Sequence, residues 1–124
     1  MAKHAWGRSE KYHRRPRTLY ALVFPRRHVY IGQSVDVQKR LQQHRRQRKW
    51  WTQNFRLVVL STEVSTTAQA KDWEHAYRQA AEWHGWRVYA EEPCVVIKRV
   101  GTQMNGRRWM ALKVWWRFGR LVRD

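Results

Sequence analysis

The stretch HVYIGQSVDVQKRLQQH, residues 28–44, begins like a β-strand, turns at a glycine and continues as a helix. Counted from Val37 at spacings of three, four and seven, the helical positions that should face a core are Arg40, Leu41 and His44. An arginine and a histidine therefore stand where a short helix needs apolar contacts. This placement indicates a face that turns toward a groove or a site as well as toward a core.

The residues before this helix predict a β-hairpin. Its parts are a strand over 18–24 (TLYALVF), a turn over 25–27 (PRR) and a strand over 28–32 (HVYIG). A three-residue turn places Phe24 opposite His28 and Leu22 opposite Tyr30. Tyr20 and Tyr30 then lie diagonally on one face of the sheet, within reach of each other.

The whole chain predicts one small α+β domain with a central antiparallel sheet, made of the hairpin and a third strand and flanked by helices. The further expected elements are a helix over 35–48 capped by Ser34, a third strand over 55–61, a helix that starts at a Thr66 cap and stops at Gly85, a fourth strand over 93–100, and a helix over 107–122. We expect residues 1–17 to form a basic flexible arm, residues 18–92 the core, and residues 93–124 a basic, Trp-rich extension packed on the same domain.

The charge of the chain is strongly one-sided. It has 26 lysines and arginines against nine acidic residues, a formal net charge of +17. Such a chain attracts polyanions over long range, so nucleic acid is the leading partner and an anionic membrane surface the second. A basic protein that is merely kept soluble by its charge is the remaining reading.

The location of the protein is predicted from what the sequence lacks. Cys94 is the one cysteine, so neither an intrachain disulfide nor a cysteine metal cluster can form. No apolar run approaches the length of a membrane span, and the first residues lack the apolar segment of a secretory signal. We therefore expect a cytoplasmic protein without a membrane partner.

The helix after the third strand repeats the oddity of the first. Its core-facing stripe is Ala70, Trp73, Glu74 and Tyr77, with a carboxylate in the middle. Such a group costs several kcal/mol unless it is ion-paired, bound to a metal or placed in a cleft. Each polar group is by itself more often structural, because strand tyrosines pack and helix arginines extend along apolar surfaces.

Together, the polar groups on these faces suit the cleavage of a phosphodiester. The set consists of Tyr20, Tyr30, Arg40, His44 and Glu74. Arginine offers a planar fork of donors to phosphate oxygens, and one carboxylate can hold a hydrated Mg²⁺. A tyrosine can accept a proton from water where nearby cations lower its pKa, and this chain is rich in cations.

The segments TLYALVF, HVYIGQS and KRLQQH resemble the core of the GIY-YIG nuclease family, named for two short motifs on a hairpin. The second motif is closely matched, whereas the first reads Thr18-Leu19-Tyr20 where the family often has Gly-Ile-Tyr. The family's metal-binding glutamate follows an alanine by four positions, as Glu74 follows Ala70 in AKDWE. The resemblance covers roughly residues 18–85.

The resemblance implies a divalent-metal-dependent DNA endonuclease with a GIY-YIG-like fold. Glu74 would hold one Mg²⁺ or Mn²⁺, and Tyr20 would act as the general base or assist it. Arg40 would clamp the scissile phosphate, while His44 and Tyr30 would position water or phosphate oxygens. The family also has a late asparagine that orders the site. Asn105 in TQMNG is the candidate, although Asn-Gly is equally an ordinary turn dipeptide.

Other basic residues are predicted to bind the nucleic-acid backbone without reading its sequence. They are Arg14, Arg15, Arg17, Lys39, Arg45, Arg46, Arg48 and Lys49. The C-terminal segment interleaves Trp109, Trp115 and Trp116 with further basic residues. These tryptophans could stack on the bases of an unpaired strand, close the core, or dock a partner subunit or a second copy.

Two other functions stay open at this point. One is a catalytically silent nucleic-acid-binding subunit of a larger nucleoprotein assembly, which the altered first motif and the distant Asn105 favour. The five retained polar groups argue against it, because a chain freed from catalysis need not keep costly groups on buried faces. The other is a ribosomal or RNA-chaperone protein, which charge alone supports. Whether the substrate is single- or double-stranded is left open.

Overall fold

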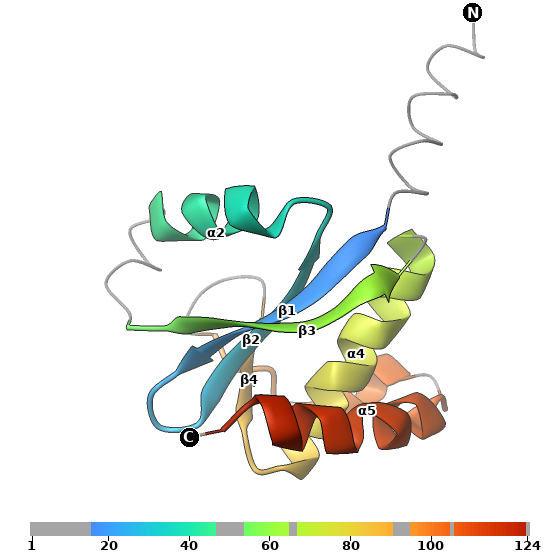
Figure 1. Ribbon diagram of the computed structural model, residues 1–124. Coiled ribbons are helices and arrows are strands. Elements are labelled where there is room, and N and C mark those ends of the chain that lie inside the picture. Colours follow the sequence, from blue (N-terminus) through green and yellow to red (C-terminus); the bar gives the residue numbers. More distant parts are fainter. Residues whose placement is uncertain (1–15, 47–53, 65–66, 91–94, 105, 124) are drawn as a thin grey trace, which may run out of the picture.

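The computed structural model describes residues 16–46, 54–64, 67–90, 95–104 and 106–123. The elements in chain order are β1 (Arg17–Phe24), β2 (His28–Ser34), α2 (Val37–Arg46), β3 (Arg56–Val64), α4 (Thr67–Trp83), β4 (Arg87–Tyr89), a short 3₁₀ helix η1 (Val100–Met104) and α5 (Arg108–Leu121). They form one four-stranded sheet with α2 on one face and α4 and α5 on the other (Figure 1). The α+β class is thus confirmed.

The sheet has the strand order β3-β1-β2-β4. β1 pairs antiparallel with β2 and with β3, as expected, whereas β4 pairs parallel with β2. The sheet is therefore mixed. The predicted strand over 93–100 is wrong, because its described part makes one isolated bridge, Tyr89 to Val96, and η1 then begins at Val100. The strand that pairs with β2 at this edge is instead β4, which comes earlier in the chain, soon after α4, and contains the buried Val88.

The hairpin has the predicted register. Leu22 lies opposite Tyr30 and Phe24 opposite His28. The turn between them holds two non-glycine residues with left-handed backbones, Arg26 at φ 62° and Arg27 at φ 58°. This conformation costs roughly 1–2 kcal/mol for each residue that has a Cβ.

Two expected boundaries move because β1 and β2 are each longer than predicted. Arg17, placed in the flexible arm, is instead the first residue of β1 and only 5% exposed. β2 continues to Ser34, so that residue stays extended and α2 begins three residues later. The helix is capped by Asp36, whose Oδ1 accepts from the Lys39 N–H at 3.1 Å. Ser34 Oγ accepts from the Asp36 N–H at 3.1 Å and so shapes the turn before the helix.

The end of α4 agrees with the prediction. Gly85 has φ 86°, and the Trp86 N–H donates to the Ala81 carbonyl at 3.0 Å. Glycine adopts this conformation at the least cost because it has no Cβ, and this residue ends the helix. The predicted cap Thr66 lies outside the described residues.

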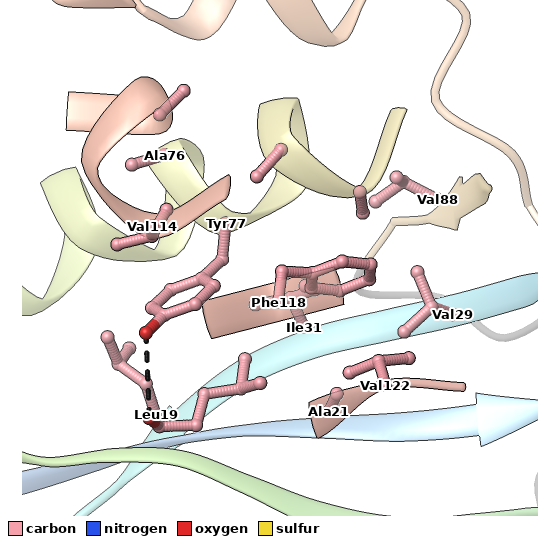
Figure 2. Close-up of a cluster of buried hydrophobic side chains, with 14 of the residues drawn as sticks. Leu19, Ala21, Val29, Ile31, Ala76, Tyr77, Val88, Val114, Phe118 and Val122 are labelled. Carbon is pink, nitrogen blue, oxygen red and sulfur yellow. Dashed lines mark hydrogen bonds between the residues drawn. The ribbon is translucent and has the colours of Figure 1, made fainter. Parts of the chain in front are cut away.

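The main core lies between the sheet and the pair of helices α4 and α5. The ring of Tyr77 points from α4 toward the sheet and lies among Leu19, Ile31 and Phe118 (Figure 2). Its hydroxyl donates to the Leu60 carbonyl at 3.5 Å. A second, smaller cluster covers the other face, where the residues of the tyrosine pair lie beneath α2. Within the described part of the chain, none of the helices has the length and apolar character needed to cross a bilayer.

Candidate active site

The two tyrosines of the hairpin lie side by side on the face that α2 covers. Their ring centroids are 6.2 Å apart, and both side chains are buried. Gly32, paired with Tyr20 across the hairpin, makes room for them. A Cβ at that position would lie 2.7 Å from the Tyr20 hydroxyl and 2.8 Å from Tyr30 Cε1. The third position of YIG is therefore a glycine because both aromatic rings occupy the space of a side chain.

His44 reaches the same face from the last turns of α2. Its Nε2 lies 2.8 Å from the Tyr20 hydroxyl, and its ring centroid lies 5.2 Å from that of Tyr30. The histidine is 4% exposed, although it stands among polar residues in the sequence. Its position on the core-facing stripe is thus explained by a buried hydrogen bond to Tyr20.

The protonation states of this pair follow from its burial. Burial raises the pKa of Tyr20, and the neighbouring Tyr30 raises it further. Burial lowers the pKa of His44 to about 4, and the charge of Arg40 adds to this effect. Near neutral pH the phenol is therefore protonated, the imidazole is neutral, and Tyr20 donates to His44 Nε2. The expectation that cations lower the tyrosine pKa is wrong, because the effect of Arg40 is smaller than that of burial.

Arg40 lies one turn before His44 and is exposed. Its guanidinium interacts with the hydroxyls of Tyr20 and Tyr30, and Nη1 donates to Gln43 Oε1 at 3.2 Å. Both tyrosines offer neutral oxygens, so these contacts orient the guanidinium and leave its charge available to an anion. Arg40 thus joins the buried Tyr20–His44 pair to the solvent.

Glu74 approaches from α4, on the opposite face of the sheet. Its Oε1 accepts from Arg78 Nη2 at 2.5 Å, and its Oε2 accepts from Gln33 Nε2 at 3.1 Å. The Glu74 side chain is 12% exposed. Burial raises the pKa of Tyr30, and the negative charge of Glu74 raises it further. The carboxylate therefore lies close to the tyrosine pair even though it comes from the other layer.

The two layers meet in one cleft at the edge of β2. β4 pairs with β2 only from His28 to Tyr30, so the end of β2 is left for α4 to approach. The cleft has a volume of about 530 Å³, and its lining includes Tyr30, Gly32, Gln33, Arg40, Lys71, Glu74 and Arg78. Tyr30, Arg40 and Glu74, which the sequence singled out, thus line one concave surface. The buried Tyr20–His44 pair lies directly behind Gly32 and Tyr30.

Sequence reasoning missed Arg78 and Gln33, which hold the carboxylate. The Glu74–Arg78 spacing of four on a helix was a signal for the ion pair. No pattern marks Gln33, which points toward α4 because it alternates with Gly32 along β2. Arg17 extends the network, since its Nη1 donates to Gln33 Oε1 at 3.4 Å. The buried Arg17 thus positions Gln33, a different role from the predicted contact to a nucleic-acid backbone.

The donor set of the cleft fits one hydrated divalent cation. The described residues contain no cluster of three or more histidine, cysteine or acidic side chains. A carboxylate offers about four lone-pair positions, and the hydrogen bonds from Arg78 and Gln33 occupy two of those on Glu74. Mg²⁺ is commonly held by one or two carboxylates together with waters and substrate phosphates. Glu74 is the residue that would bind it.

The other predicted site residues divide into two groups. Lys39, Arg45 and Arg46 are exposed on α2, and Arg45 Cζ lies 5.2 Å from the centroid of the Phe55 ring. Outside the described residues lie Arg14, Arg15, Arg48, Lys49 and Asn105. The predicted roles of both groups stay predictions.

A comparison with protein families identifies one model that matches this chain. The model is described as the GIY-YIG catalytic domain, and it matches residues 16–86. The matched region is more than half of the chain and ends before η1 and α5. It contains the polar residues described above for this site, which are Arg17, Tyr20, Tyr30, Gln33, Arg40, His44, Glu74 and Arg78. Searches of curated proteins and of solved structures find no match.

Proposed function

The chain belongs to the GIY-YIG family, a family of nucleases, and on this premise we propose that it is a divalent-metal-dependent DNA endonuclease that hydrolyses phosphodiester bonds. The observation that carries the proposal is the cleft itself. A neutral, buried Tyr20–His44 pair stands behind an exposed arginine and a carboxylate. These are the groups needed to take a proton from water and to stabilise a pentacovalent phosphate.

Arg40 is proposed to bind the scissile phosphate. Its guanidinium is at the mouth of the cleft and offers parallel N–H donors that match two non-bridging oxygens. The negative charge on these oxygens grows as the bond breaks, so the contact strengthens in the transition state. Tyr30, on the same side of the cleft, would donate its hydroxyl proton to a phosphate oxygen or to the attacking water.

The proton of the attacking water is proposed to leave through Tyr20 and His44. Because its pKa is raised, Tyr20 does not ionise by itself near neutral pH. Its oxygen would accept a proton from water as its own proton passes to His44 Nε2, 2.8 Å away. The pair then consists of a neutral phenol and an imidazolium, and the hydroxide attacks phosphorus. The bound phosphate favours this transfer because its negative charge stabilises the imidazolium.

Glu74 is proposed to hold Mg²⁺ or Mn²⁺, which would stabilise the negative charge on the leaving oxygen. Gln33 and Arg78 donate to the two carboxylate oxygens and set the orientation of the group. Such supporting hydrogen bonds commonly decide how well a metal ligand performs.

A catalytically silent nucleic-acid-binding subunit is the second candidate function. The observation that favours it is the 2.5 Å ion pair between the buried Arg78 and Glu74. The positive charge of Arg78 compensates the negative charge of Glu74, which a metal ion would need. The altered first motif, Thr18-Leu19-Tyr20, points the same way.

One experiment separates the two functions. Circular single-stranded and double-stranded DNA are incubated with the protein in Mg²⁺, in Mn²⁺ or in excess EDTA, with a Tyr20→Phe protein as control. We expect nicking or linearisation in the divalent metals only, reduced by about 10²-fold or more in the control. Tight DNA binding without cleavage in either metal would establish the silent subunit. Undiminished cleavage in EDTA would remove the metal from the mechanism.

A further inference from the structure

A second pocket lies at the opposite end of the hairpin from the cleft. It has a volume of about 490 Å³ and is formed by the β1–β2 turn, the start of β3, Trp86 and Arg123, which follows α5. In Figure 1 the C-terminal end of the chain lies beside this turn. Among the residues that the structure describes, the pocket shares no lining residue with the cleft.

The pocket is cationic, and hydrogen bonds orient three of its four arginines. Arg26, Arg27, Arg56 and Arg123 line it, and its described lining contains no acidic residue. Three of these guanidiniums donate to backbone carbonyls. Arg27 Nη2 donates to His84 O at 2.5 Å, Arg123 Nε to Arg120 O at 3.2 Å, and Arg56 to Arg123 O. A backbone carbonyl orients a guanidinium but carries no full negative charge, so the arginines that line the pocket would attract an anion.

The backbone at the pocket carries an unusual conformation. Arg26 and Arg27 both have positive φ values, 62° and 58°. Glycine or asparagine adopts this conformation at lower cost, and the chain places an arginine at each position. Strained backbones of this kind gather at binding and catalytic sites.

We propose that this pocket binds a phosphate group of the nucleic-acid strand that is cleaved. The inference rests on the proposed function and adds a second contact to the same substrate. The arginines would bind the phosphate oxygens, and the apolar walls, Phe24, Phe55 and Trp86, suit the less polar body of a nucleotide.

The distance between the cleft and the pocket is one that a single nucleic-acid strand can span. Tyr20 and Phe24 are four residues apart on β1, roughly 13 Å. At ~3.4 Å of rise per nucleotide, this corresponds to about four nucleotides. Arg45 on α2 is exposed, and its Cζ lies 5.2 Å from the centroid of the Phe55 ring, which lines the pocket, so Arg45 adds positive charge beside it. The phosphate in the pocket is thus either an internal phosphodiester of the strand or a phosphomonoester at an end that lies about four nucleotides from the cleavage position.

The test is a binding measurement in EDTA, so that cleavage does not enter. Fluorescence anisotropy reports the affinity of oligonucleotides with a 5′-phosphate, with a 3′-phosphate or with neither. The pocket variant is Arg26→Asn with Arg123→Gln, since asparagine tolerates a positive φ. The matched control, Lys113→Gln with Arg120→Gln, removes the same charge from exposed positions on α5 that do not line the pocket.

We expect the pocket variant to lose about tenfold in affinity and the control less than about threefold. The slope of log K against log salt should become shallower by ~0.7–0.9, the value for one phosphate contact. An equal loss for all three oligonucleotides assigns the pocket to an internal phosphodiester. A loss confined to one phosphorylated end assigns it to that phosphomonoester.

Equal losses of affinity in the pocket variant and the control, at unchanged melting temperatures, would overturn the inference. The affinity would then depend on the net charge of the protein and not on the pocket. Cleavage is measured separately in Mg²⁺. Normal cleavage by a protein whose pocket variant binds like the control would support the proposed function and contradict this inference. Pocket-dependent binding by a protein that never cleaves would support this inference and contradict the proposed function.

Discussion

At the residue scale, Arg40 and His44 illustrate two outcomes of one sequence pattern. Both stand on the core-facing stripe of α2, four positions apart. His44 is buried and bonded to the Tyr20 hydroxyl, whereas Arg40 is exposed at the mouth of the cleft. A short helix lying at the margin of a sheet buries only part of its inward face. Polar groups at the boundary are then either satisfied inside or left to meet a ligand.

The substitution Glu74→Gln separates chemistry from stability. It leaves the side chain of Arg78, 6% exposed, without its anionic partner. Loss of one partner of a buried pair costs about 3 kcal/mol or more, so we expect a clearly lower melting temperature and cleavage reduced by about 10³-fold or more. Thermal unfolding and single-turnover cleavage measure the two effects.

The double variant Glu74→Gln with Arg78→Met is the control. Removing the buried cation as well should restore much of the stability, because the remaining groups carry no uncompensated charge. Cleavage should stay lost if Glu74 binds the metal. Near-normal cleavage by a stably folded double variant would contradict the assignment of Glu74.

His44 predicts a particular dependence of stability on pH. Its pKa lies near 4 in the folded protein, below the ordinary value of 6.5. Between these values the unfolded chain binds the proton more readily, so the free energy of unfolding falls as the pH drops from about 6.5 toward 4. Above pH 6.5 the contribution of His44 to stability is complete.

The measurement is thermal unfolding from pH 4 to pH 8 for the original protein and for His44→Gln. Glutamine keeps polar atoms near Tyr20 and does not titrate. We expect the difference in melting temperature between the two proteins to change mainly between pH 6.5 and pH 4. Parallel curves across this window would show that the imidazole does not have the lowered pKa.

At the element scale, β2 connects the two halves of the site. Along this strand Tyr30 and Gly32 face α2, whereas Gln33 faces α4 and binds Glu74. The alternation of side chains along one strand thus brings both layers to one cleft. Its last residue, Ser34, leads directly into the cap of α2.

The cap of α2 is testable by two alanine substitutions. Asp36→Ala removes the acceptor of the Lys39 N–H and should lower the free energy of unfolding by about 1 kcal/mol. Cleavage should also fall, because the first turn of α2 carries Arg40, whose N–H donates to Asp36 O at 3.0 Å. Chemical denaturation of Asp36→Ala, Ser34→Ala and the exposed control Gln38→Ala measures the effect. A larger loss of unfolding free energy for Ser34→Ala than for Asp36→Ala would show that Ser34 is the cap.

At the scale of the whole molecule, a net charge of +17 governs how the protein meets a polyanion. Binding should release counterions from many phosphates. If about six phosphates are contacted, DNA affinity should fall by about 10³-fold between 50 and 200 mM salt. Anisotropy titrations in EDTA at several salt concentrations measure this slope, and nearly salt-independent binding would contradict it.

The sequence by itself determined the local features of this protein. The register of the hairpin follows from the two-residue period of a strand and from a three-residue turn, and it placed Tyr20 beside Tyr30. Helical spacing brought His44 to the same face, and Gly85 marked the end of α4. Each depends on residues a few positions apart, for which backbone geometry leaves few choices.

Only the tertiary structure decided the features that join distant segments. The parallel pairing of β4 with β2, the burial of Arg17 and its bond to Gln33, and the compensation of Glu74 by Arg78 all depend on how α4 crosses the sheet. The cationic pocket likewise needs the chain's C-terminal end beside the hairpin turn. Burial, and with it the direction of each pKa shift, depends on what packs against a residue from elsewhere in the chain, which local periodicity does not encode.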